Sequence, residues 1–116
     1  MKSFKLIVFL CILFLSNNLF AQKIGDGVVL AHFNAGWNSA NEVKWLGELT
    51  DCNTNTFDIV TNPDLPKEYK IVVVPTILIL EDGEEVARFQ ANIMMQMEAT
   101  RKEVQGSIDE IIMSKF

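Results

Sequence analysis

Few side chains in this sequence are suited to metal binding or to acid–base chemistry near neutral pH. The chain contains one histidine, His32, and two cysteines, Cys11 and Cys52. A structural zinc site takes about four Cys or His ligands, so the sequence predicts no metal site. It contains no glycine-rich phosphate-binding motif either, and we expect no cofactor.

Ser39 is the one hydroxyl for which a nucleophilic role can be formulated, with His32 as its base. However, Glu42 follows Ser39 after three residues, which is the spacing of a helix-capping box. A capping serine uses its hydroxyl to bond backbone amides, and no acidic residue is identifiable that would orient His32. We therefore favour capping over catalysis for Ser39.

Residues 1–21 have the pattern of a secretory signal peptide. Lys2 and Lys5 supply positive charge, residues 6–15 form an uninterrupted apolar run, and Ala21 offers a small residue for cleavage. The apolar run is shorter than the roughly 18 residues that a membrane-spanning helix needs. We expect an exported protein, periplasmic or extracellular, with one domain at residues 22–116 and no membrane attachment after cleavage.

The expected mature chain is short and acidic. Cleavage after Ala21 leaves 95 residues (116 − 21) and eight basic against 15 acidic residues, a net charge of −7. This length fits one domain, and the charge argues against a nucleic-acid partner, which requires clustered Lys and Arg. Cys52 cannot form an internal disulfide in such a chain, so it is either buried and inert or exposed and able to pair with another molecule.

Hydrophobic periodicity and turn signals predict alternating strands and helices. Strands are predicted at 28–33, 56–60, 76–80 and 85–90, and helices at 39–49, 66–69 and 94–113. Asp82-Gly83 predicts a hairpin turn, whereas Pro75 is excluded from the interior of a central strand. The strand–helix–strand start predicts a parallel pair. We therefore expect an α/β fold with a mixed four-stranded sheet and helices on its faces.

Three segments carry a resemblance to the thioredoxin family. Residues 29–37 (VLAHFNAGW) are similar to the family's strand leading to its active-site Trp, and Val74-Pro75-Thr76 to its hydrophobic–cis-proline–Thr segment. Leu80–Glu84 is similar to its hairpin with a turn glycine. The matches occur in the family's order and extend over about residues 28–112. The resemblance implies a thioredoxin-like three-layer sandwich, trimmed at its N-terminus because only residues 22–27 precede the first strand.

The sequence departs from this family at the residues that do its chemistry. In the family a Cys-x-x-Cys motif follows the Trp at the start of a helix, whose N-terminus lowers the pKa of the first thiol. Here these positions are Asn38-Ser39-Ala40-Asn41, and the family's buried acidic residue falls on His32. Because an amide cannot form a thiolate or a disulfide, neither Asn38 nor Asn41 is a catalytic residue, and we expect a redox-inactive protein.

The resemblance retains a surface for polypeptide binding. In the family, the backbone at the position of Val74 pairs with an extended peptide, and Trp37 lies at the rim of the same surface. The leading hypothesis is a polypeptide-binding or chaperone-like module that uses Trp37, Asn38, Val74 and Pro75. Core packing of Trp37 and a purely loop-shaping role of Pro75 are the alternatives.

Two further hypotheses depend on Cys52. It could make the protein a monothiol redox enzyme, or it could link a structural homodimer. Cys52 follows the predicted helix instead of starting it, so it lacks the activation that a helix N-terminus gives.

Overall fold

The computed structural model describes residues 24–116. The signal peptide predicted at residues 1–21 and the predicted start of the domain at residue 22 lie outside the described residues and stay predictions. Within residues 24–116, no helix has the length and apolar character that crossing a bilayer requires.

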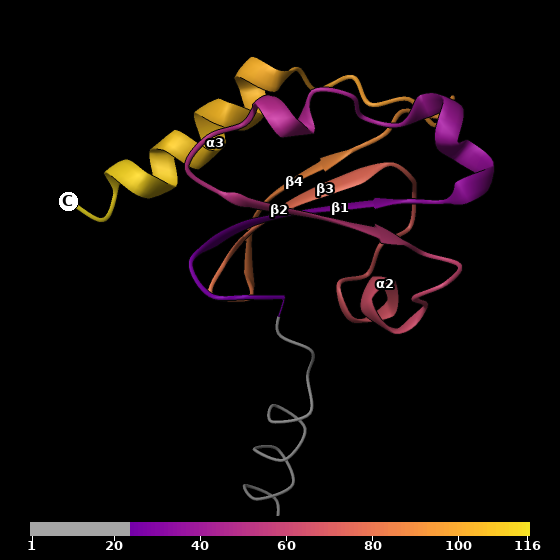
Figure 1. The fold of residues 1–116 in the computed structure, drawn as a ribbon, viewed down its shortest axis with the longest axis horizontal. Helices are drawn as coiled ribbons and strands as arrows, with labels where there is room; N and C mark the ends of the chain where they lie inside the picture. Colours follow the sequence, from indigo (N-terminus) through magenta and orange to yellow (C-terminus); the bar gives the residue numbers. More distant parts are fainter. Residues whose placement is uncertain (1–23) are drawn as a thin grey trace, which may run out of the picture.

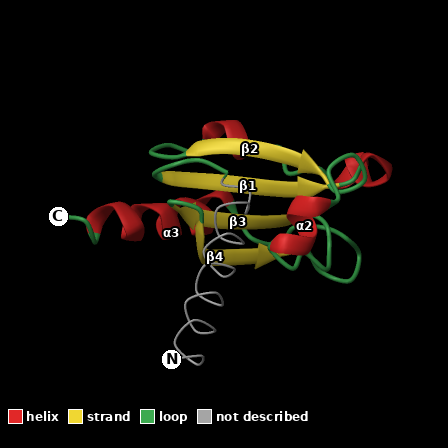
Figure 2. Ribbon diagram, turned by 90° about the horizontal axis from the view of Figure 1, so that it is seen from below, coloured by secondary structure: helices red, strands yellow, loops and turns green. Residues whose placement is uncertain are grey.

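Four strands form one mixed sheet in the order β2-β1-β3-β4 (Figure 2). They are β1 (Val28–Asn34), β2 (Asn53–Asp58), β3 (Thr76–Glu81) and β4 (Glu84–Gln90). β1 is parallel to β2 and antiparallel to β3, and β3 is antiparallel to β4. The predicted mixed sheet is confirmed, although β2 begins and ends earlier than the predicted strand at 56–60.

Helices cover both faces of this sheet and complete three layers (Figure 1). α3 (Arg101–Met113) and the segment with the 3-10 helices η1 (Gly36–Asn41) and η2 (Leu46–Glu48) lie above the sheet in Figure 1. The short helix α2 (Asp64–Glu68) lies below it. This is the three-layer α/β arrangement that the sequence predicts.

The hydrophobic core is divided between the two faces because successive strand residues point in opposite directions. On the α3 face, Leu30 and Ile79 pack with Val104 and Ile108 of α3. On the α2 face, Phe33 and other strand residues pack against Leu65 of α2. All seven residues of β1 are buried, which is why its sequence is almost continuously apolar.

The helix predicted from Ser39 to residue 49 is wrong. The segment forms η1 and η2, and Glu42 between them has a non-helical backbone with φ −59° and ψ 140°. Ser39 lies inside η1 and does not cap it, since no side chain caps this helix. Val43 and Leu46 are nevertheless buried in the core, so the predicted apolar stripe packs as expected without helical geometry.

The two other helices have different bounds from those predicted. The last helix begins at Arg101 rather than at Met94, and the hydroxyl of Thr100 accepts a 3.2 Å hydrogen bond from the Glu103 N–H. Thr100 is therefore the N-cap that satisfies one of the free amides of the first turn. α2 spans Asp64–Glu68 instead of residues 66–69.

The predicted hairpin turn at Asp82-Gly83 is confirmed. Both residues have positive φ, 53° and 87°, as a tight two-residue hairpin turn requires. The Asp82 carboxylate also accepts a 2.7 Å hydrogen bond from the Gly27 N–H, which ties the turn to the start of β1.

Candidate functional site

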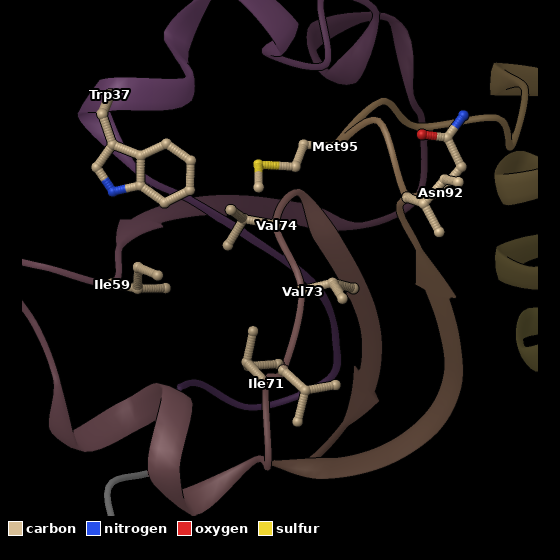
Figure 3. Close-up of a pocket in the computed structure, with 9 residues that line it drawn as sticks. Trp37, Ile59, Ile71, Val73, Val74, Asn92 and Met95 are labelled. Atoms are coloured by element: carbon tan, nitrogen blue, oxygen red, sulfur yellow. The ribbon is translucent and has the colours of Figure 1, made fainter.

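An apolar groove lies at one end of the strands, where β1 and β2 end and β3 begins (Figure 3). Its volume is about 230 Å³. It is lined by residues from four separate loops, namely Trp37, Ile59, Ile71, Val72, Val73, Val74, Asn92, Ile93 and Met95.

The strand directions explain why these four loops meet. β1 and β2 are parallel, so the loops that follow them leave the sheet at the same end of the strands. β3 is antiparallel to β1, so it begins at this end. β4, which is antiparallel to β3, ends there. The topology therefore brings together Trp37, Ile59, Val74 and Met95, which are far apart in the sequence.

The lining of the groove contains no charged residue, and parts of it are strongly exposed. Trp37 is 64% exposed and Ile93 is 98% exposed, and Met95, which also lines the groove, is partly exposed. Exposed apolar side chains that gather around a groove are typical of a binding surface. Methionine adapts to differently shaped apolar partners because its side chain is flexible and polarisable.

Asn38 lies beneath this surface and holds the loops in place. It is 5% exposed, and its amide N–H groups donate to Asn34 Oδ1 at 3.1 Å and to the Met95 carbonyl at 3.3 Å. Its Oδ1 accepts a 2.9 Å hydrogen bond from Asn41. The structure thus gives Asn38 and Asn41 internal partners, and neither residue lines the groove.

This network reaches a backbone position of high energy. Met95 has φ 60°, which is uncommon for a residue other than glycine. Its N–H donates to the Asn92 carbonyl at 3.0 Å, and its own carbonyl accepts from Asn38. The Met95 side chain is therefore directed to the groove by a loop that is fixed at both of its backbone polar groups.

Val74 lines the groove, and Pro75, which follows it, is not among the lining residues. The Val74–Pro75 peptide bond is cis. Val74 is only 4% exposed, and its side chain lies between Trp37 and Met95 in Figure 3. The Val73 carbonyl accepts a 2.6 Å hydrogen bond from the Thr76 hydroxyl. The backbone polar groups of Val74 have no hydrogen-bond partner among residues 24–116.

Comparison with solved structures identifies the architecture. The chain is 29% identical to a single-site mutant of the thioredoxin from Halobacterium salinarum, with a TM-score of 0.58, covering 73% of this chain and 74% of that one. Its fold is that of thioredoxin. Thioredoxin 1 from Thermosipho africanus (21% identity, TM-score 0.56, 75% and 97% covered) and Fasciola hepatica thioredoxin (23%, 0.54, 72% and 80%) are also similar.

No protein-family model matches this sequence, and no curated protein sequence does. What the comparisons support is a thioredoxin-fold module in general.

His32, in the middle of the thioredoxin-fold sheet, is buried and has no serine partner. It is 1% exposed, its Nδ1 lies 3.3 Å from the Thr56 hydroxyl, and its Nε2 has no partner among the described residues. Ser39 and Glu42 line a second, smaller pocket of about 150 Å³ together with His32. No His32–Ser39 hydrogen bond forms within residues 24–116, so this arrangement is not an activated nucleophile.

Cys52 lies at the opposite end of the sheet from the groove. It precedes Asn53 at the start of β2, which pairs with Val29 at the start of β1, whereas Trp37 follows the end of β1. Cys52 is partly exposed and free. Burial raises the pKa of its thiol, against a smaller lowering by a hydrogen bond with Thr54. At neutral pH this disfavours the thiolate, which is the reactive form.

Only part of the groove is predictable from local sequence. Trp37 and Val74, which the structure brings together, are predicted from the sequence, whereas Ile59, Ile93 and Met95 are not. The available signal was the apolar run Ile93-Met94-Met95 shortly after β4, of which the helix predicted at 94–113 takes in only the two methionines. Among residues 24–116 no three His, Cys, Asp or Glu side chains gather as metal ligands do.

Proposed function

We propose that this protein is a redox-inactive polypeptide-binding module of thioredoxin fold, with a chaperone-like role, that holds an extended apolar segment in the groove beside Trp37 and Val74. The observation that carries the proposal is the groove itself, because its lining contains eight apolar side chains and one asparagine but no charge. An extended segment fits because the unpartnered backbone groups of Val74 offer it strand-like hydrogen bonds.

Thiol chemistry is not required for this function. The positions that follow Trp37 are occupied by Asn38 and Asn41, whose amides support the loops of the groove. Binding therefore depends on apolar contact and on backbone pairing. No observation favours a redox function for Cys52, since its thiol pKa is raised and it lies at the other end of the sheet.

The binding proposal is tested with fluorescein-labelled decapeptides that alternate Val, Ile or Phe with Ser. Their fluorescence anisotropy is measured against increasing protein concentration, with peptides in which Asp replaces the apolar residues as the comparison. We expect the apolar peptides to bind and the Asp peptides not to bind. Binding of both series alike, or of neither, would contradict the proposal.

Two groove variants and one matched control locate the binding. Trp37→Ala and Ile93→Ser remove exposed apolar side chains, so they should weaken binding about tenfold or more, equivalent to about 1.4 kcal/mol. Val86→Ser removes a comparable exposed side chain from β4, near the other end of the sheet, and should leave the affinity unchanged. Equal affinities of all four proteins would place binding elsewhere.

The proposal also includes export, on the basis of residues 1–21. Mass spectrometry of the protein secreted by, or released from the periplasm of, producing cells should find Gln22 as the first residue. An intact Met1 in that material would contradict export by cleavage.

A further inference from the structure

The two edges of the sheet differ in how they are protected from further strand pairing. β4 carries Glu84, Glu85 and Arg88, with an Arg88–Glu85 ion pair of 2.6 Å, and its pairing with β3 is irregular at Ile79/Leu80. Charges and irregular pairing are the usual means by which proteins block an edge strand. β2 carries a single charged residue, Asp58 at its end, whereas residues 53–57 are uncharged, contain no proline and pair with β1 in continuous register.

The backbone groups that β2 turns to solvent can be assigned. The Ile59 N–H donates to the Asn34 carbonyl at 3.0 Å, so residue 59 faces β1. Because successive residues alternate in direction along a strand, Asn55 and Phe57 also face β1. The N–H and C=O groups of Thr54 and Thr56 therefore point away from the sheet. Both residues are exposed, and β2 is the outermost strand in Figure 2.

We infer that the edge of β2, which no other strand of residues 24–116 covers, is a contact surface for a second copy of this chain, through antiparallel pairing of β2 with β2. The triplet Thr54-Asn55-Thr56 has the same residue types in both directions. A two-fold axis beside Asn55 therefore places Thr54 opposite Thr56 of the partner subunit, and Thr56 opposite Thr54 of the partner subunit. Each such pair exchanges two backbone hydrogen bonds, which satisfies every outward group of the triplet.

The side chains fit this register as well. Threonine pairs across antiparallel strands are favourable, and Asn55 faces Asn55 of the partner subunit without charge. The whole chain has a net charge of −5, so two copies repel one another over most of their surfaces. The uncharged stretch of β2 lets them approach. Cys52 lies opposite Asp58 of the partner subunit, so the dimer contains no disulfide.

A contact of two short strands buries less surface than the roughly 800 Å² per partner of standard interfaces. We therefore expect a monomer–dimer equilibrium rather than a permanent dimer. Sedimentation equilibrium over a concentration series should show the dimer fraction rising with concentration, with the same result in the presence and absence of a reducing agent. A monomer at every concentration up to the millimolar range would overturn the inference.

Charge variants at Asn55 test the register. Asn55→Lys and Asn55→Asp each place like charges opposite one another, so each protein alone should lose at least nine-tenths of its dimer, and an equimolar mixture should restore it as a heterodimer. Both substitutions are at an exposed position and leave the core intact. Val86→Lys adds the same charge at the β4 edge and should dimerise like the unaltered chain.

Other results assign the contact elsewhere and overturn the inference. A dimer that persists in both Asn55 variants does not use this register. A dimer that Trp37→Ala abolishes, with Asn55→Lys unaffected, uses the apolar groove. A dimer that a reducing agent abolishes is linked through Cys52.

Discussion

Asn38 stands where the resemblance to thioredoxins places a nucleophilic cysteine, and the structure gives it a mechanical task. Its amide donates to Asn34 and Met95 and accepts from Asn41; the first bond is buried and the other two are partly buried. A cysteine has one weak donor and one weak acceptor, whereas an amide offers two donors and two lone pairs. The exchange of thiol for amide therefore couples the end of β1 to the Met95 loop.

The first prediction is that Asn38→Ala lowers the free energy of unfolding by about 1–3 kcal/mol, because it leaves buried polar partners unsatisfied. Ser39→Ala is the matched control, since Ser39 is exposed and has no side-chain hydrogen bond among the described residues, and it should change stability by less than about 0.5 kcal/mol. Urea unfolding followed by circular dichroism measures both. Equal effects of the two substitutions would contradict the role of Asn38.

His32 is the second residue whose environment has a measurable consequence. Burial lowers the pKa of its imidazole below the ordinary value, while the nearby Glu42 carboxylate raises it by a smaller amount. The folded protein therefore favours neutral His32. As the pH falls, the unfolded chain takes up this proton first, and stability decreases where the unfolded state binds more protons.

We therefore predict that the contribution of His32 to stability is complete above about pH 6.5 and is lost progressively as the pH falls below that value. The free energy of unfolding, measured in urea from pH 8 to pH 5, should fall more steeply in the unaltered chain than in His32→Gln, which does not titrate. Other ionisable groups act alike in both proteins, so the difference between the two curves reports His32. Parallel curves would show that burial does not shift this pKa.

At the scale of elements, the strands were predictable and one helix was not. β1 and β3 are buried on both faces, so their continuous apolar runs identify them directly. The Ser39–Glu42 and Thr100–Glu103 pairs both have the capping-box spacing, but only Thr100 caps a helix. The segment after Ser39 contains Asn41, Val43 and Trp45, which favour a helix less than Arg101, Lys102 and Gln105 in α3 do.

The groove was predictable only in part because it is a property of tertiary structure. Trp37 and Val74 were identified by a family resemblance in their local sequence. No local sequence motif marks Ile59, Ile93 or Met95. They reach the groove because the strand directions bring their loops to the same end of the sheet. The order and direction of strand pairing decide which loops meet, and hydrophobic periodicity does not predict that order.

At the scale of the whole molecule, the same topology separates the groove from the only thiol in the described chain. Asn53, next to Cys52, pairs with Val29, whereas the loop with Trp37 begins after Asn34, five residues further along β1. At about 3.3 Å per residue, the length of sheet between them is roughly 16 Å. A polypeptide held beside Trp37 therefore does not present a disulfide to Cys52.

The last prediction follows from this separation. The protein should show no reduction of insulin disulfides above the rate of dithiothreitol alone, because Asn38 and Asn41 supply no thiol and the thiol of Cys52, whose pKa is raised, lies at the far end of the sheet. Cys52→Ser should leave both this background rate and the affinity for apolar peptides unchanged. Insulin precipitation, followed by turbidity, measures the first quantity, and fluorescence anisotropy measures the second. Turnover above background that disappears in Cys52→Ser would instead identify a monothiol enzyme. Loss of peptide affinity in the same variant would place the binding surface at the start of β2 rather than at the groove.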